Sequence, residues 1–119
     1  EIYLNALSGI CVMSGSAPSV DNNTVRDNRG TGLEVADAEG TFQGNKIYSS
    51  AEANVMVSQG GGGIFKSNSI HDGKSYGIHC VQSKGSFLGN EISRNALAAV
   101  CSSLGATPNF QGNILRDGR

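Results

Sequence analysis

The chain has 119 residues, enough for one domain, and its 9 basic and 10 acidic residues give a net charge of −1. Basic and acidic residues alternate along the sequence, and no basic tract interleaved with aromatic residues indicates a nucleic-acid surface. No apolar run approaches the ~18 residues that a membrane-spanning helix needs. Nucleic acids and membranes are therefore not expected as partners.

Short apolar stretches follow one another from the start of the chain, and each alternates apolar with other residues. The stretch at Ile2 comes first, the tetrad 9–12 follows, Val20 marks a third stretch, and Val25 begins the series again. Alternation with a period of two indicates β-strands rather than helices. Each repeat of the sequence is therefore predicted to contain three short strands.

An asparagine two residues before an aliphatic residue recurs at steps of 22, 23, 22 and 23 residues. The five positions are Asn23, Asn45, Asn68, Asn90 and Asn113. A period of this length is typical of a solenoid, in which each repeat buries its apolar face against its neighbours. The sequence therefore predicts an all-β fold, a right-handed single-stranded parallel β-helix of about five coils. It forms one segment over residues 1–119.

Stacked coils are expected to place equivalent residues in inward columns. One column contains Ile10, Leu33, Val55, Ile78 and Val100, and a second contains Val25, Ile47, Ile70, Ile92 and Leu115. A third contains Val20, Phe42, Phe65, Phe87 and Phe110. An amide carries both a donor and acceptors, so the asparagine column predicts a self-satisfied ladder rather than a ligand or metal site. Glycine is expected at the corners, where φ is often positive.

Neither end of the sequence contains an amphipathic stretch that could cap a terminal coil. We therefore expect a segment of a longer β-helix without its caps, which can associate end to end. Cys11 and Cys101 are predicted four coils apart, roughly 19 Å at strand spacing, and Cys80 in the core. Free thiols favour a reducing compartment, so the expected location is cytoplasmic or nuclear.

Two segments resemble a known class of repeat. His71-Asp72-Gly73 followed by Gly77-Ile78, and the stretch 89–100, resemble the parallel β-helix repeats of F-box proteins. They are also similar to the wider class of repeats shared with carbohydrate-binding and sugar-hydrolase modules. In F-box proteins, the resemblance implies recognition of a substrate protein for a ubiquitin ligase. The sequence contains no F-box segment, so that role would belong to a longer protein.

No constellation of convergent carboxylates, metal ligands or a nucleophile emerges from the spacing. Asp27, Asp72 and Asp117 recur only every second coil, about 10 Å apart, which is too far to share one calcium ion. His71 beside Asp72 could be a base oriented by a carboxylate, but the recurrence of the aspartate indicates a corner motif. We therefore favour a non-catalytic role, with no catalytic residue, metal or cofactor.

One outward column contains Cys11, Glu34, Met56, His79 and Cys101. Side chains on a flat sheet face do not converge on one point as metal ligands do. Methionine and histidine on such a face are compatible with a modest contact surface. Glu34, Met56, His79 and Cys101 are therefore the predicted partner-binding residues.

Two functions remain open. The favoured prediction is a protein-recognition or scaffold module of a larger protein, in a ubiquitin-ligase-like context as the resemblance implies. The alternative is a carbohydrate-binding or carbohydrate-active β-helix of lyase or hydrolase type, with a polysaccharide as partner. Sugar-binding surfaces favour exposed aromatic residues, for which only Tyr3, Tyr48 and Tyr76 are candidates.

Overall fold

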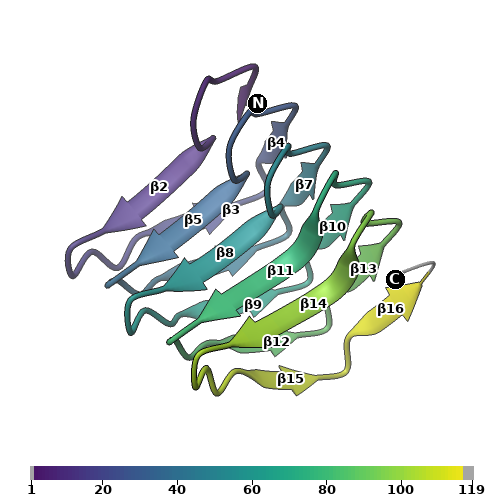
Figure 1. Ribbon diagram of the computed structural model, residues 1–119. Helices are drawn as coiled ribbons and strands as arrows, with labels where there is room; N and C mark the ends of the chain where they lie inside the picture. Colours follow the sequence, from purple (N-terminus) through teal and green to yellow (C-terminus); the bar gives the residue numbers. More distant parts are fainter. Residues whose placement is uncertain (1, 117–119) are drawn as a thin grey trace.

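The computed structural model describes residues 2–116, which form strands β1 to β16 and no helix. Strands one coil apart pair in parallel and build three sheets along the axis (Figure 1). Sheet A consists of β1 (Ile2–Tyr3), β4 (Thr24–Arg26), β7 (Lys46–Tyr48), β10 (Ser69–His71), β13 (Glu91–Ser93) and β16 (Ile114–Arg116). Sheet B consists of β2 (Ile10–Met13), β5 (Leu33–Ala36), β8 (Val55–Ser58), β11 (Tyr76–Val81) and β14 (Ala98–Ser103). Sheet C consists of β3 (Ser19–Asp21), β6 (Thr41–Gln43), β9 (Ile64–Lys66), β12 (Ser86–Leu88) and β15 (Asn109–Gln111). The predicted parallel solenoid with three strands per coil is confirmed.

The core contains the three predicted columns and a fourth one formed by Val12, Val35, Val57 and Cys80. In each column an inward residue pairs in register with its equivalent one coil away. Val25 pairs with Ile47, and Leu33 pairs with Val55. The phenylalanine rings stack along sheet C with centroids 4.6–4.8 Å apart. Phe42, Phe65 and Phe87 are fully buried, and each buried ring contributes about 1.5–3 kcal/mol of transfer free energy.

The asparagine ladder is also confirmed, at the bend between sheets C and A. The Oδ1 atom of Asn68 accepts from the backbone N–H and the Nδ2 of Asn45, at 2.9 and 3.0 Å. Its Nδ2 donates to Asn90 Oδ1 and to the carbonyl of Phe42. The same pattern continues from Asn90 to Asn113. The ladder therefore satisfies backbone groups that no sheet hydrogen bond reaches.

Glycine occupies part of the corners, as expected, but twelve other residues of the described range also have positive φ. Each coil turns at three corners, and the first left-handed residue of most of these corners is not glycine. The corner after sheet A uses Leu4, Asp27, Ser49, Asp72 and Arg94, with φ between 51° and 58°. The corner after sheet B uses Ser14, Asp37, Gln59, Gln82 and Leu104. The corner after sheet C uses Asn22, Gly44, Ser67, Gly89 and Gly112, and between sheets B and C further glycines have positive φ: Gly15, Gly40, Gly60, Gly63, Gly85 and Gly105. The hydrogen bonds between coils hold the residues other than glycine in a conformation that costs about 1–2 kcal/mol each.

A second polar ladder lies at the bend after sheet A. Its regular members include Asn28, which accepts from the N–H and the amide of Asn5, and Asn95, which accepts from the N–H of Gly73. Gly73 has no side chain, and the amide of Asn54 fills the space: a Cβ at Gly73 would lie 2.6 Å from Asn54 Nδ2. Asn54 Nδ2 donates to Asn95 Oδ1 and to the carbonyl of His71. Asn54 therefore replaces the missing ladder residue and anchors the end of β10.

Candidate functional site

The outer face of sheet A carries a continuous row of polar and aromatic side chains. Strand register places Tyr3, Arg26, Tyr48, His71, Ser93 and Arg116 in this row, which we call the sheet A row. The Arg26 guanidinium lies 4.3 Å from the centroid of the Tyr3 ring. The Tyr48 and His71 rings stack at 4.8 Å with an interplanar angle of 11°. The planar groups therefore lie face to face along the axis and present their polar edges outward.

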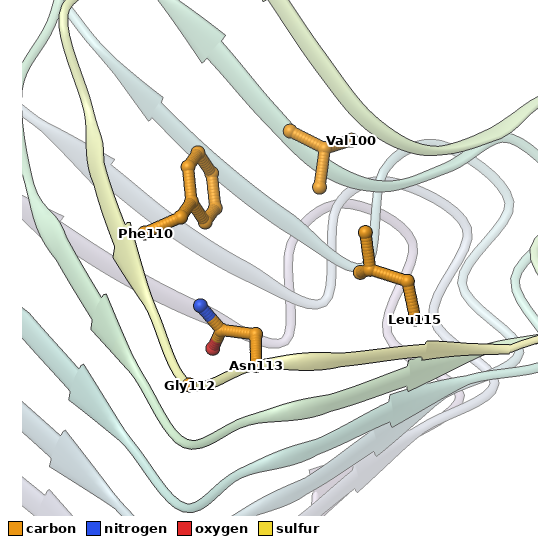
Figure 2. A pocket seen from close by; sticks show the side chains of 5 residues that line it. All are labelled: Val100, Phe110, Gly112, Asn113 and Leu115. Carbon is orange, nitrogen blue, oxygen red and sulfur yellow. The ribbon is translucent and has the colours of Figure 1, made fainter.

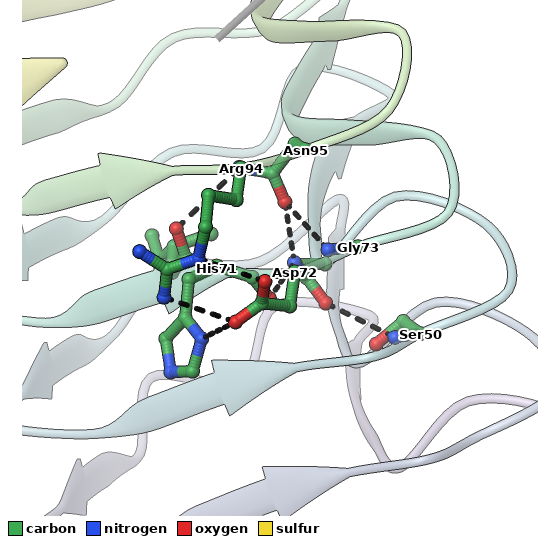
Figure 3. Close-up of polar contacts among 8 residues, drawn as sticks. Ser50, His71, Asp72, Gly73, Arg94 and Asn95 are labelled. Carbon is green, nitrogen blue, oxygen red and sulfur yellow. Dashed lines mark hydrogen bonds and ion pairs between the residues drawn. The ribbon is translucent and has the colours of Figure 1, made fainter. Parts of the chain in front are cut away.

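An ion-pair network adjoins this row where the chain leaves β10 and β13 (Figure 3). Asp72 Oδ2 lies 2.6 Å from His71 Nδ1, and its carboxylate accepts from Arg94 Nε at 2.9 Å and Nη2 at 3.0 Å. Arg94 first, and His71 second, hold the pKa of the Asp72 carboxyl down at about 2. Asp72 is therefore ionised at neutral pH. Its Oδ2 atom is therefore the acceptor in the contact with His71 Nδ1.

The backbone of this corner is fixed from inside the bend. Asp72 and Arg94 are equivalent left-handed residues on neighbouring coils, and the N–H of Asp72 donates to the carbonyl of Ser93. The second polar ladder holds the residues next to them through Asn54 and Asn95. The Asp72 carboxylate and the Arg94 guanidinium are thus presented on a rigid scaffold, which suits recognition of a ligand with a fixed shape.

The fold separates charges that alternate along the sequence. Six basic residues of the described range lie on sheet A or within the first three residues after its strands: Arg26, Arg29, Lys46, Lys74, Arg94 and Arg116. Three acidic residues lie there: Asp27, Asp72 and Glu91. The remaining charges of this range are Lys66 and Lys84 against Asp21, Glu34, Asp37, Glu39 and Glu52. Sheet A is therefore the basic side of a molecule whose other sides are acidic.

The predicted partner-binding residues do lie together, on the outer face of sheet B. Glu34 pairs in register with Met56, Met56 with His79, and His79 with Cys101. All four are half-buried, and Cys11 extends the row beside Glu34. We call these five residues the sheet B row. Their alignment follows the predicted column, and their role in binding remains a prediction.

A shallow depression adjoins the sheet B row. Its volume is about 460 Å³, and its lining residues are Leu7, Ser8, Cys11, Gly30, Glu34 and Glu52. The Ser8 hydroxyl donates to Glu34 Oε1 at 2.8 Å. Partial burial first, and Glu34 second, raise the pKa of the Cys11 thiol. This end of the row therefore combines apolar surface, carboxylates and a thiol held in its neutral form.

Residues 2–116 contain no group of three or more His, Cys, Asp and Glu side chains that could hold a metal ion. The cysteines of the chain are free thiols, and burial raises the pKa of Cys80 to about 11. Because thiolates are the metal-binding and nucleophilic form of cysteine, Cys80 acts as a small apolar core residue.

A second depression, of about 350 Å³, lies at the last described coil (Figure 2). Figure 2 shows Val100, Phe110 and Leu115 pointing into it from three strands. These side chains belong to three of the inward core columns. The depression is therefore a continuation of the apolar interior rather than a site with its own chemistry.

A family model described as right-handed beta helix region matches residues 1–119. The chain belongs to the right-handed β-helix family. No curated protein sequence matches it. Among solved structures, a double mutant of the periplasmic alginate epimerase AlgG is similar, with a TM-score of 0.71 and 12% identity. The similarity covers 96% of this chain and 38% of that one. At this identity the similarity establishes the fold alone.

Sequence reasoning found the sheet B row but missed the site on sheet A. His71 and Asp72 were interpreted as a corner motif, and they are one, because Asp72 is a left-handed corner residue. Their link to Tyr48 and Arg94 lies across coils, at separations of 23 and 22 residues. Writing this β-helix sequence in rows of one coil would have brought the four residues together.

Proposed function

We propose that this β-helix is a carbohydrate-binding segment of a larger protein and that the sheet A row, with Asp72 and Arg94, is its ligand surface. The observation that carries the proposal is the rigid array of polar edges formed by Tyr48, His71, Asp72 and Arg94. Sugars offer hydroxyl groups at fixed positions on a stiff ring. A hydroxyl, an imidazole nitrogen, a carboxylate and a guanidinium supply both donors and acceptors for them.

The name of the similar solved structure supports the same class of ligand, since an alginate epimerase acts on a polysaccharide. The proposal reverses the preference that the sequence suggested. The scarcity of exposed aromatic residues counted against sugars, but here the aromatic residues form part of a hydrogen-bonding row. Binding through polar edges does not require an exposed ring face.

The two histidines of the chain provide a matched test, because His71 lies on sheet A and His79 on sheet B. Calorimetric titration of the whole chain with neutral and acidic oligosaccharides should identify a binding class. In H71Q, loss of a hydrogen bond of about 1–1.5 kcal/mol should weaken that binding about tenfold. H79Q should bind like the wild type. Equal losses in both variants, or no binding by the wild type, would contradict the proposal.

A second candidate function is recognition of a protein segment by the sheet B row, as in the F-box resemblance. The observation that favours it is the depression beside Cys11 and Glu34, which continues a half-buried and largely uncharged surface. A variant with E34K, M56K and H79E should lose a protein partner that H71Q retains. A partner lost equally from both variants would speak against this surface.

A further inference from the structure

We propose that the depression beside the sheet B row binds an arginine or lysine side chain of an extended protein segment, whose apolar neighbours lie on the sheet B row. This inference rests on the second candidate function, protein recognition by sheet B, and names the chemistry of the partner. It concerns a different surface from the carbohydrate site proposed on sheet A. The occupant is identified by charge complementarity and by the apolar surroundings of the charge.

The depression exists because a glycine stands between two larger residues on successive coils. The Gly30 N–H donates to the carbonyl of Leu7, and the Glu52 N–H donates to the carbonyl of Gly30, so the three residues lie side by side along the axis. A Cβ atom at Gly30 would lie 2.9 Å from the carbonyl carbon of Leu7, so a larger residue would require the backbone to shift. The depression therefore opens between the Leu7 and Glu52 side chains, which both line it.

Two carboxylates give the depression its charge. Glu34 and Glu52 both line it, and none of its six lining residues is basic. The Ser8 hydroxyl donates to Glu34 Oε1 at 2.8 Å, which orients that carboxylate and leaves acceptor capacity for a second donor. No ion pair between residues 2–116 involves either glutamate, and Arg29, the cation next to Gly30 in sequence, pairs with neither. Within this part of the chain the two negative charges are therefore available to a cation from a partner.

The apolar lining distinguishes a protein side chain from an inorganic cation. Leu7 is 79% exposed, and the neutral thiol of Cys11 lies beside Glu34 in register. Arginine and lysine place their aliphatic stems along apolar surface of this kind while the charged head reaches polar groups. Calcium needs six to eight oxygen ligands, which is more than two carboxylates and one hydroxyl supply. The depression therefore fits a long basic side chain better than a metal ion.

The surface beyond the depression suits an extended segment. Strand register places Met56, His79 and Cys101 after Glu34 on successive strands, and all three side chains are half-buried. Three strand spacings amount to about 14 Å, the length of about four residues of extended chain. Thioether, imidazole and thiol groups are compatible with contact to apolar residues of a partner. The expected segment therefore has a basic residue at one end and apolar residues in the next few positions.

The test compares two peptides that differ by one charge. The first is acetyl-Gly-Arg-Leu-Gly-Leu-Gly-amide, and the second has citrulline in place of arginine, with the same shape and no charge. Titration of the isotope-labelled whole chain, followed by amide chemical shifts in NMR spectra, should show about three- to tenfold tighter binding of the arginine peptide. The shifts should include the amides of Ser8, Gly30 and Glu52. Added salt should reduce the difference between the peptides by screening.

Two double variants locate the charge. E34Q/E52Q removes both carboxylates of the depression, and D37N/E39Q removes two exposed carboxylates that do not line it. Glutamine at position 34 retains an oxygen that accepts from Ser8, and asparagine tolerates the left-handed conformation of Asp37, so both variants should fold. E34Q/E52Q should bind the two peptides with affinities within twofold of each other. D37N/E39Q should keep the three- to tenfold preference for arginine.

The outcomes separate this inference from the functions proposed above. Equal affinity of the wild type for the two peptides, or no binding of either at millimolar concentration, would overturn it. Equal loss of the preference in both double variants would also overturn it, because the charge would then act from the whole surface. A protein partner lost from the variant with E34K, M56K and H79E but retained by E34Q/E52Q would leave recognition by sheet B intact without the basic residue. Carbohydrate binding is tested separately by H71Q, on the other surface.

Discussion

Replacing Asn68 by leucine should be among the most damaging single changes in this β-helix. The two side chains have nearly the same shape, so N68L removes hydrogen bonds with little change in packing. Asn68 is buried at the centre of the ladder, where its amide takes part in four hydrogen bonds. The substitution deprives the Asn45 N–H of its acceptor and the Phe42 carbonyl of the amide donor.

The magnitude follows from the groups left behind. An unsatisfied buried polar group costs about 1–3 kcal/mol, so the two backbone groups cost about 2–6 kcal/mol together. Burial of the leucine side chain returns about 1.5–3 kcal/mol. The midpoints of these ranges differ by about 2 kcal/mol, so we expect N68L to lower the free energy of unfolding by about that amount. This is a large fraction of the 5–15 kcal/mol typical of a domain.

Asn23 provides the matched control, because it occupies the same column near the first coil. Its amide donates to the carbonyl of Asp21 at 3.1 Å, in an exposed setting, so N23L should cost less than about 1 kcal/mol. Urea unfolding followed by far-ultraviolet circular dichroism gives both values. Equal destabilisation by N68L and N23L would refute the ladder as a source of stability.

Five further substitutions test particular features of the fold. D72N should destabilise by at most about 1 kcal/mol at pH 7, since the carboxylate is 43% exposed and screened. The pKa of the Asp72 carboxyl is lowered to about 2, so its contribution to stability is present above about pH 4 and is lost as the pH falls toward 2. Thermal melts of D72N and the wild type should therefore coincide near pH 2. N54G should lower the free energy of unfolding by about 2 kcal/mol, because it removes an amide of the second polar ladder. The double variant N54G/G73N should recover most of that loss in urea unfolding, because it places an asparagine at the regular ladder position. Ser67 and Gly89 both have positive φ at the corner after sheet C. S67G should therefore stabilise the fold by about 0.5–1 kcal/mol, and G89A should destabilise it by about 1 kcal/mol. Melting temperatures that moved in the opposite directions would exclude backbone strain at this corner.

The fold was predictable because one period governs every level of the structure. The step of 22 or 23 residues fixed the coil length, the two-residue alternation fixed the strands, and the Val/Phe column fixed sheet C. Register then followed, since an equivalent position one coil later must pair with its predecessor. All these signals come from core residues, where burial constrains the residue type.

The corners were less predictable because their constraint is backbone geometry rather than burial. Serine, aspartate, glutamine, leucine and arginine all adopt the left-handed conformation here, so residue type indicates the corner poorly. The second polar ladder was hidden for a related reason. Its missing member at Gly73 is replaced by Asn54, which lies in a column otherwise occupied by Gly9, Gly32, Gly77 and Ala99. A single chain shows such an exchange only when both positions are seen in space.

The surface on sheet A illustrates why a neutral sequence can fold into a polarised molecule. In a β-helix, the position of a residue within its coil determines which of the three sides it lies on. Charged residues that are close in sequence can therefore lie on different sides. Arg26, Lys46, Lys74, Arg94 and Arg116 are separated by 20 to 28 residues, so no local window contains two of them. The coil gathers them on one side, beside the stacked rings and the Asp72 network. Net charge and local charge pattern therefore could not indicate this uneven distribution of charge among the sides.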